Sequence, residues 1–444
     1  MSEEFDYLNT IDHEPAEDEI VGFRLENGFT VLMCKNHETP AVAVDLWYKV
    51  GSRDEQPGKS GFAHLFEHMM FEGSENVKKS EHIKIISDVG GIVNGSTSPD
   101  RTNYWEVVPS NQLELVFWLE ADRMRSLDLS EKNFENQRST VKEERRLRVD
   151  NQPYMRVLYE LKDEVAYQNF AYRHSVIGSM EDLDNATLED VRQFHQIYYR
   201  PNNAVMAIVG DFQVQPTLNL VRKYFETIPA GPPVPPVDLS EPPQQKERRV
   251  QYPDPFAPFP AYLFAYHIPE RTHPDYYPLH LLEKILFDGE SSRLYRKLIE
   301  EKPVALHLFG GWDGKFGPGL LYGFAQVHPA SSIQELEETV RQEFEQIQKY
   351  PVSQRELEKA KNKVKADFVL KKETYHTRAE QLCLYATIFN NPDMMEIELN
   401  RFLNVTIDDL LAVSQKYFSR ENRSVIEIYP GQTRPEFNEP DGNK

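Results

Sequence analysis

The segment GFAHLFEHMMFEGS, residues 61–74, has a partial copy in PLHLLEKILFDGES, residues 278–291. Both fit the frame H-L-x-E-x-x-x-F-x-G, and their histidines are 216 positions apart (280 − 64). A second pair of similar segments, YYRPNNAVMAIVG at 198–210 and YFSRENRSVIEIY at 417–429, has an offset of 219 (417 − 198). Two matches at nearly the same offset indicate that the chain is an internal duplication.

Each half of the chain mixes strand and helix patterns. TPAVAVDLWYKVG alternates apolar and polar residues as a strand does, and NNAVMAIVGDF is typical of a buried strand. Helices are expected at 60–72, 114–127 and 131–149 in the first half, and again at 357–372 and 378–389 in the second. The sequence therefore predicts an α+β fold of two homologous domains, each a mostly antiparallel sheet covered by helices.

A proline-rich stretch, IPAGPPVPPVDLSEPPQQKERR, separates the halves and is typical of a stiff, partly polyproline-II linker. The predicted organisation is an acidic arm at 1–17, a first domain at 18–228 that contains the complete motif, a linker at 229–249, a homologous second domain at 250–432 that contains the altered copy, and a tail at 433–444.

Length and composition are those of a globular protein of two to three domains: 444 residues, 40% hydrophobic and 27% charged. No run of about 18 apolar residues occurs, so no membrane span is expected. A net charge of −21 disfavours nucleic acid and anionic membranes as partners. Cys34 and Cys383 form no Cys-x-x-Cys pair, so neither a disulfide scaffold nor a cysteine zinc site is expected.

The acidic start, MSEEFDYLNTIDHEPAEDE, lacks the apolar core of a signal peptide. We expect a short arm here, or the remnant of a targeting segment that was removed. The few cysteines fit a reducing compartment, so the expected location is the cytoplasm, or the periplasm if an N-terminal signal was removed.

The first copy of the motif has the residues of a metal site. On a helix, positions i and i+4 share a face, so His64 and His68 can bind one ion, and two imidazoles suit Zn²⁺ better than Mg²⁺ or Ca²⁺. Glu67 lies at the edge of that face, where it can take the proton of a water acidified by zinc. H-x-x-E-H inverts the common zinc-protease motif H-E-x-x-H. Buried structural histidines are the alternative, and the pattern alone does not identify a third ligand.

The second copy keeps His280 and Glu283 but has Lys284 in place of the second histidine. An ammonium group only donates hydrogen bonds and repels a cation, so these three residues are expected to bind no metal.

Four segments make the chain resemble the inverzincin peptidases of the M16 family, which include pitrilysin, insulin-degrading enzyme and the mitochondrial processing peptidase. They are VGSRDEQPGKSGFAHLFEHMMFEGS, GGIVNGSTSPDRTNYW, TVKEERRLRVDNQPY and YYRPNNAVMAIVGDF. The resemblance covers nearly the whole chain and is closest for bacterial members of this length. It implies two homologous domains, one zinc ion per chain held by the first domain only, and peptide hydrolysis in a chamber closed by two facing halves.

The resemblance also implies site residues. The third zinc ligand of the family corresponds to Glu144, 76 positions beyond His68, with Glu143 as the fallback. The family adds its peptide substrate as a further strand to an edge strand. That strand resembles GGIVNGSTSPDRTNY here, which gives as substrate-binding residues Asn94, Gly95, Ser96 and Thr97.

Two departures from the family pattern bear on function. The family often has a glutamate seven residues before the ligand glutamate, where this chain has Gln137, so a charge near the zinc ligands is missing. The family also places an Arg and a Tyr of the second domain near the substrate, where this chain has Ile299 and Leu306. The resemblance therefore implies a heterodimer with a homologous chain that supplies Arg and Tyr; a homodimer is the alternative.

Two functions remain open from the sequence. One is a zinc endopeptidase that cleaves peptides or unfolded segments, with Glu67 as the general base. The other is a non-catalytic scaffold that binds peptides within a larger complex. The complete set of His64, Glu67, His68 and Glu144 favours the enzyme, because a scaffold has no need of it.

Overall fold

A computed structural model describes residues 14–431, so most of the predicted acidic arm and the predicted tail at 433–444 lie outside the described residues. The chain forms two compact units. The first comprises Met1–Glu143, Phe170–Asp238 and Lys365–Asn400, and the second comprises Glu144–Asn169, Leu239–Val364 and Arg401–Lys444. Each unit contains one mixed sheet with helices packed on it, which confirms the predicted α+β duplication.

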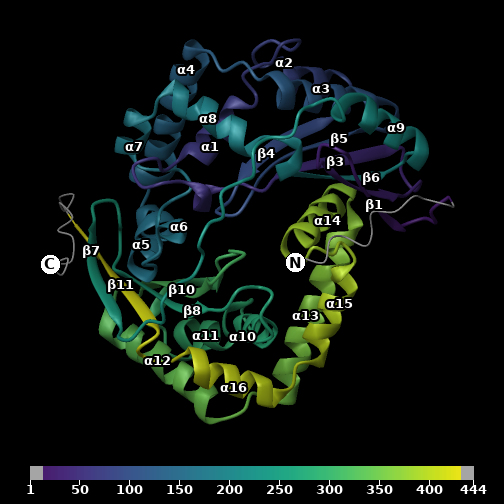
Figure 1. The fold of residues 1–444 in the computed structure, drawn as a ribbon. Helices are drawn as coiled ribbons and strands as arrows, with labels where there is room; N and C mark the ends of the chain where they lie inside the picture. The colour runs from purple at the N-terminus through teal and green to yellow at the C-terminus, as the bar shows by residue number, and fades with distance from the viewer. Residues whose placement is uncertain (1–13, 432–444) are drawn as a thin grey trace. The chain divides into compact units, whose positions relative to one another are not determined.

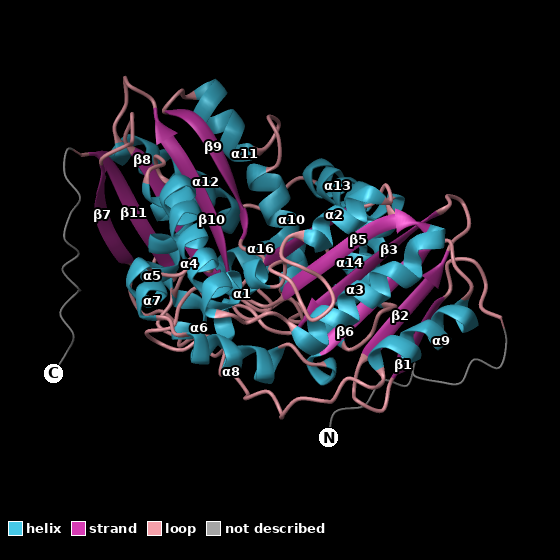
Figure 2. Ribbon diagram, turned by 90° about the horizontal axis from the view of Figure 1, so that it is seen from above, coloured by secondary structure: helices cyan, strands magenta, loops and turns pink. Residues whose placement is uncertain are grey.

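The first unit is built on a six-stranded sheet in the order β1-β2-β6-β3-β5-β4, and Figure 2 labels all of these strands except β4. All neighbours are antiparallel except β2 and β6, which are parallel. The strands are β1 Ile20–Arg24, β2 Thr30–Lys35, β3 Ala41–Tyr48, β4 Ile92–Thr97, β5 Thr102–Pro109 and β6 Ala204–Gly210. Every residue of β6 is buried, as its apolar composition predicts, and β4 lies at one edge of the sheet.

Helices cover both faces of this sheet. On one face the core includes Leu65 and Phe66 of α1, Phe117 of α3 and Val221 of α9. The opposite face carries α14 (Figure 1). The helices of this unit, with α4 continuing two residues into the second, are α1 Phe62–Met69, α2 Glu81–Asp88, α3 Leu113–Ser126, α4 Glu131–Arg145, α6 Phe170–Arg173, α7 Met180–Asn185, α8 Leu188–Tyr198, α9 Val214–Phe225 and α14 Tyr375–Phe389.

The second unit has a five-stranded sheet in the order β7-β11-β8-β10-β9, in which only β7 and β11 are parallel. Its strands are β7 Arg248–Asp254, β8 Ala261–Ile268, β9 Ala305–Trp312, β10 Gly319–Val327 and β11 Arg423–Pro430. Its helices are α5 Lys162–Ala166, α10 Tyr276–Phe287, α11 Arg293–Tyr295, α12 Ile333–Lys349 and α16 Ile407–Tyr417. Two further helices, α13 Gln354–Glu373 and α15 Met394–Asn404, are divided between the two units.

The units exchange segments, whereas the domains expected at 18–228 and 250–432 were contiguous. Helix α14 belongs to the first unit because its buried residues, among them Cys383, pack on β3 and β6. Conversely, residues 144–169 belong to the second unit. There the backbone N–H of Tyr154 donates to Asp254 over 2.7 Å. The residues against which a segment packs decide the unit to which it belongs. The sequence duplication does not reveal these packing partners.

Local sequence signals explain most element boundaries. Helix α8 begins at a capping box in which Thr187 and Asp190 bond each other's backbone N–H groups. Residues 229–247, in the proline-rich stretch, form neither helix nor strand. Within the described part of the chain, no helix combines the length and apolar character that crossing a membrane requires.

Candidate metal centre

Helix α1 carries the H-x-x-E-H motif and is fastened at its first turn. Gly61 precedes it with φ of 88°, and a Cβ at this position would lie 2.8 Å from the carbonyl oxygen of Ile177, so only glycine fits. The buried carboxylate of Glu55 accepts the N–H groups of Gly61 and Ala63 at 2.9 and 2.8 Å. His174 donates to the same carboxylate at 2.9 Å. These contacts fix the direction in which the helix presents its side chains.

One face of α1 is buried and the other holds the polar motif. Leu65 and Phe66 are each 1% exposed and pack in the core, whereas His64, Glu67 and His68 are half-buried on the remaining face. The spacing of four residues brings the two imidazole rings within 4.9 Å of each other, centroid to centroid, at an interplanar angle of 82°. The sequence prediction for this pair rested on that spacing.

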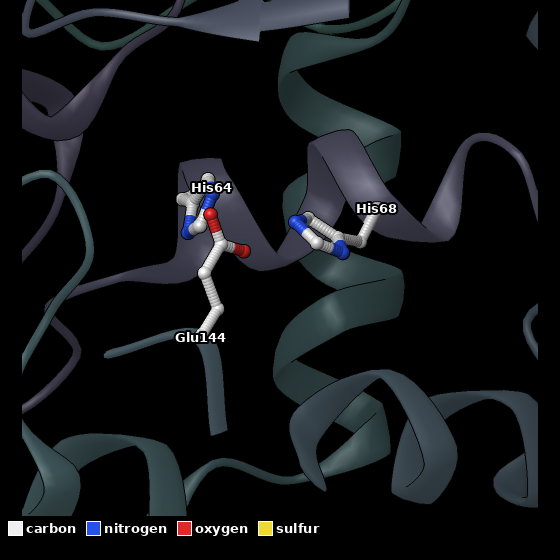
Figure 3. A group of neighbouring side chains, drawn as sticks. All are labelled: His64, His68 and Glu144. Atoms are coloured by element: carbon white, nitrogen blue, oxygen red, sulfur yellow. The ribbon is translucent and has the colours of Figure 1, made fainter. Parts of the chain in front are cut away.

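Glu144 completes a group of three possible ligands. His64, His68 and Glu144 each offer one ligand atom, and these atoms all lie within 4.8 Å of one another (Figure 3). Two imidazole nitrogens, one carboxylate oxygen and room for water are a donor set that catalytic zinc sites use. The residue types and their convergence therefore fit Zn²⁺.

The helix α4 positions Glu144. The division between the units falls between Glu143 and Glu144, but α4 is one continuous helix, so its residues 131–143 in the first unit fix where Glu144 lies. Glu144 is half-buried and forms an ion pair with Nη1 of Arg148 at 2.7 Å. Glu143, the fallback ligand, is exposed and is not in the three-residue group.

Gln137 lies seven residues, or two helical turns, before Glu144 on α4. Its Oε1 is 3.3 Å from Nδ1 of His68, and the residue is 8% exposed. When Nδ1 carries the proton and donates to this oxygen, Nε2 of His68 is left to bind a metal. The amide supplies this contact without the negative charge that a glutamate would add.

Glu67 makes a contact that the sequence did not predict. Its Oε2 accepts a hydrogen bond from Oγ1 of Thr97 at 2.5 Å. The sequence placed Thr97 in the substrate-binding strand and gave no signal that its hydroxyl reaches the motif helix. The structure thus joins the proposed base to the end of β4.

The strand β4 pairs only with β5 and leaves its outer edge open. Ser98 N–H donates to Arg101 O at 2.8 Å across the turn, so by antiparallel alternation the backbone groups of Thr97 and Gly95 point away from β5. The Gly95 N–H is bonded at 2.9 Å by the side chain of Asn94, which is exposed. Ser96, by contrast, pairs with Asn103 of β5 and donates to its Oδ1 at 2.7 Å.

The second copy of the motif has different surroundings. The ring of His280 lies against Tyr276, Phe402 and Trp312 at centroid distances of 5.7, 5.4 and 6.4 Å. The Nζ atom of Lys284 is 3.7 Å from a carboxylate oxygen of Asp288. In residues 14–431, the groups of His and Glu close enough to share a metal do not include this copy.

A second group of possible ligands, His82, Glu106 and Glu120, lies in the core of the first unit. Arg123 already pairs with Glu120, lies 3.6 Å from Glu106, and stacks on Tyr104 at 4.3 Å. Burial raises the pKa of Glu120 to about 8 and lowers that of His82 to about 3. One guanidinium and one retained proton balance the two carboxyls, so this cluster needs no metal and joins α2 and α3 to β5.

Comparison with protein families gives matches over most of the chain. The model described as insulinase, peptidase family M16, matches residues 30–179. The model described as the peptidase M16 inactive domain matches residues 185–364. The first match contains the motif helix, β4 and Glu144, and the second contains the altered copy.

Individual relatives agree with these matches. The chain is 32% identical over 409 residues to the zinc protease PqqE of Helicobacter pylori, with 91% of this chain and 92% of that protein covered. It is 23% identical over 428 residues to rat mitochondrial-processing peptidase subunit beta, covering 94% of this chain and 85% of that protein.

Solved structures show the same fold. The crystal structure of a protease from Helicobacter pylori superposes with a TM-score of 0.89 at 31% identity, over 94% of this chain and all of that chain. A protein from Pseudomonas fluorescens, described as a peptidase M16 inactive domain, gives a TM-score of 0.81 at 18% identity, with 94% and 100% covered.

Proposed function

This chain belongs to the insulinase (M16) family of peptidases, and from that premise we propose that it is a zinc metalloendopeptidase. The observation that carries the proposal is the convergence of His64, His68 and Glu144 within 4.8 Å, with Glu67 on the same helix as the two histidines. One zinc ion per chain would be held by these three ligands, leaving one position open to water or substrate.

Zinc, when bound, supplies a Lewis acid that polarises the scissile carbonyl and acidifies water. The protein supplies the proton transfers. Glu67 takes a proton from the attacking water and afterwards gives it to the leaving amine. Gln137 would keep Nδ1 of His68 engaged, which would leave Nε2 of this residue to hold the ion. The hydrogen bond from Thr97 holds one carboxylate oxygen of Glu67.

The substrate would be an extended peptide or an unfolded segment that adds to the edge of the first sheet as a seventh strand. The open edge of β4, with the backbone groups of Gly95 and Thr97 directed outward, supports this placement. The N–H of Gly95 donates to the side chain of Asn94, which would have to release it when a peptide pairs with β4. Thr97 is at the end of the strand beside Glu67, so the scissile bond would lie at this end of the paired segment.

We also propose that the enzyme acts as the catalytic subunit of a heterodimer. The resemblance to the family implies an Arg and a Tyr where this chain has Ile299 and Leu306, and neither of these side chains can donate a hydrogen bond to a developing oxyanion. Leu306 is 42% exposed at the beginning of β9, an edge strand of the second sheet. A homologous partner chain would supply the missing donors.

Zinc analysis and a quenched peptide assay test the activity. Purified protein loaded with zinc is expected to contain one equivalent per chain and to cleave the peptide, and a chelator should abolish cleavage until zinc is restored. A protein that binds the peptide but neither holds zinc nor cleaves would favour the non-catalytic scaffold.

The partner is tested by adding homologous chains. Losing one oxyanion donor costs on the order of 10²–10³ in rate in other hydrolases, so a partner with Arg and Tyr should raise kcat by about that factor. Full activity of the single chain, unchanged by any homologous partner, would refute the heterodimer and leave the zinc proposal standing.

A further inference from the structure

The edge strand and the motif helix are joined by one side-chain hydrogen bond. Thr97 is the last residue of β4, and its Oγ1 donates to Oε2 of Glu67 at 2.5 Å. Both residues are half-buried, so this bond is partly shielded from water. The other oxygen of the carboxylate is not engaged by this hydroxyl.

The position of the Thr97 hydroxyl is fixed by the hairpin that follows it. Thr97 pairs with Thr102, whose own hydroxyl donates at 2.9 Å to the carbonyl oxygen of Val50, a buried residue just after β3. Arg101, in the turn, donates to the carbonyl oxygen and the hydroxyl of Ser96 at 2.9 and 2.6 Å. The end of β4 is therefore held on its inner side, before any further strand adds to its outer edge.

A glutamate side chain has three rotatable bonds, and a general base must face the water it deprotonates. A hydrogen bond to one carboxylate oxygen removes most of that freedom and directs the other oxygen. A β-branched residue also suits a strand for packing reasons alone, so a purely structural role of Thr97 is the competing explanation.

We propose that Thr97 is a positioning residue that orients Glu67 and links this base to the strand on which the substrate pairs. This inference rests on the proposed zinc peptidase activity. A peptide added along β4 continues the sheet at the residue that holds the base, so pairing and orientation of the base occur together.

Three variants test the inference. Thr97→Val keeps the shape and removes the hydroxyl, Thr97→Ser keeps the hydroxyl, and Thr227→Val is the matched control. The Thr227 hydroxyl lies on the surface, 3.2 Å from a guanidinium nitrogen of Arg125. We expect Thr97→Val to lower kcat about 10- to 100-fold with KM and zinc content unchanged, as misplacement of a catalytic group does. Thr97→Ser should restore most of the kcat that Thr97→Val loses, and Thr227→Val should retain the parent kcat.

A measurement independent of activity decides the position of Glu67. Crystal structures of the metal-free parent and Thr97→Ser should show the Glu67 carboxylate on the hydroxyl of residue 97, and Thr97→Val should show it rotated away or spread over several orientations. An unchanged kcat with an unchanged Glu67 orientation in Thr97→Val would overturn the inference. So would a raised KM at unchanged kcat, or a loss of kcat that follows a loss of zinc.

The two proposals fail in different ways. If zinc-loaded parent protein cleaves no peptide, either alone or with a homologous partner chain that carries the Arg and Tyr, the peptidase proposal fails, while the crystal structures still establish whether Thr97 holds Glu67. If the parent cleaves and Thr97→Val matches it in kcat and in Glu67 orientation, only the positioning role fails.

Discussion

Helices α1 and α10 contain the same sequence frame in two different settings. In both, the leucine after the first histidine is buried, at 1% for Leu65 and 0% for Leu281. In α1 the polar motif faces Glu144 and Thr97, whereas in α10 three aromatic rings surround His280. The frame therefore specifies how a helix packs on its sheet, and residues outside the frame decide whether the helix can hold a metal.

The largest effect is expected when the proposed general base of α1 is removed, with the corresponding glutamate of α10 as the control. Glu67→Gln should retain zinc and lose about 10³-fold or more in kcat, since a positioned base at a metal-activated water contributes on the order of 10²–10⁴ and no other carboxylate of the motif replaces it. The matched change Glu283→Gln should leave both quantities unaltered. Zinc analysis and peptide assays on both variants provide the check, and a fall in zinc with Glu67→Gln would make this residue a ligand.

The next effect separates two adjacent glutamates of α4. Glu144→Gln removes a carboxylate from the three-residue group and should weaken zinc binding by more than the roughly 10- to 100-fold typical of changes outside the ligands. Glu143→Gln, on an exposed side chain, should weaken it much less. Competition with a chelator measures both affinities, and the reverse order would move the ligand to Glu143.

A smaller effect is expected from restoring the missing charge beside His68. Gln137→Glu places a carboxylate at the acceptor of the His68 Nδ1–H group, which increases the basicity of the imidazole. Zinc affinity should rise by up to about 10-fold, the lower end of the range for such contacts. An affinity that falls in this variant would show that the amide is the better partner at this position.

The last effect concerns the pH dependence of stability and leaves metal binding and the reaction aside. The central strand β3 of the first sheet contains Asp45, whereas β8 of the second contains no acidic residue. Burial raises the pKa of Asp45 to about 7, against opposing hydrogen bonds from Asn103 and Trp47. Between about pH 4 and pH 7 the folded protein thus binds more protons than the unfolded chain, so this group makes stability fall as pH rises, by at most about 1.4 kcal/mol per pH unit.

Asp45→Asn replaces the titrating carboxyl with a neutral amide, so the variant lacks this pH dependence. The free energy of unfolding of the variant, relative to the parent, should therefore increase from about pH 4 to pH 7 and stay level above. Urea denaturation at several pH values gives this difference, and a difference that does not change with pH would mean that Asp45 is ionised throughout.

Patterns confined to neighbouring residues predicted much of this molecule. Alternation predicted β3, apolar composition predicted β6, and the helical spacing of His64 and His68 predicted that they share a face. Glu144 came from a family resemblance, because no periodicity links a helix residue to another helix 76 positions away. The contact between Thr97 and Glu67 had no signal in the sequence, since it depends on how a hairpin packs beside a helix.

Local sequence patterns also did not predict the buried charged residues. Glu106 and Arg123 are 0% and 1% exposed, although charged residues are ordinarily expected at the surface. Arg123 pairs with Glu120 on its own helix, but the carboxyl of Glu106 is balanced by Arg123 of α3 and approached by His82 of α2, contacts that form only when α2, α3 and β5 are assembled. For the same reason the exchange of α14 into the first unit was missed.

The packing of α14 on β3 and β6 has a consequence for biosynthesis. The last residue of β6, Gly210, is followed by 179 residues before Phe389 completes α14 (389 − 210). At 5–20 residues per second, translation of this stretch takes about 10 to 35 s. During that time the nascent chain contains all six strands of the first sheet, but the face on which α14 will pack is still uncovered. The first unit is therefore expected to keep this face uncovered until α14 has been translated and can pack on β3 and β6.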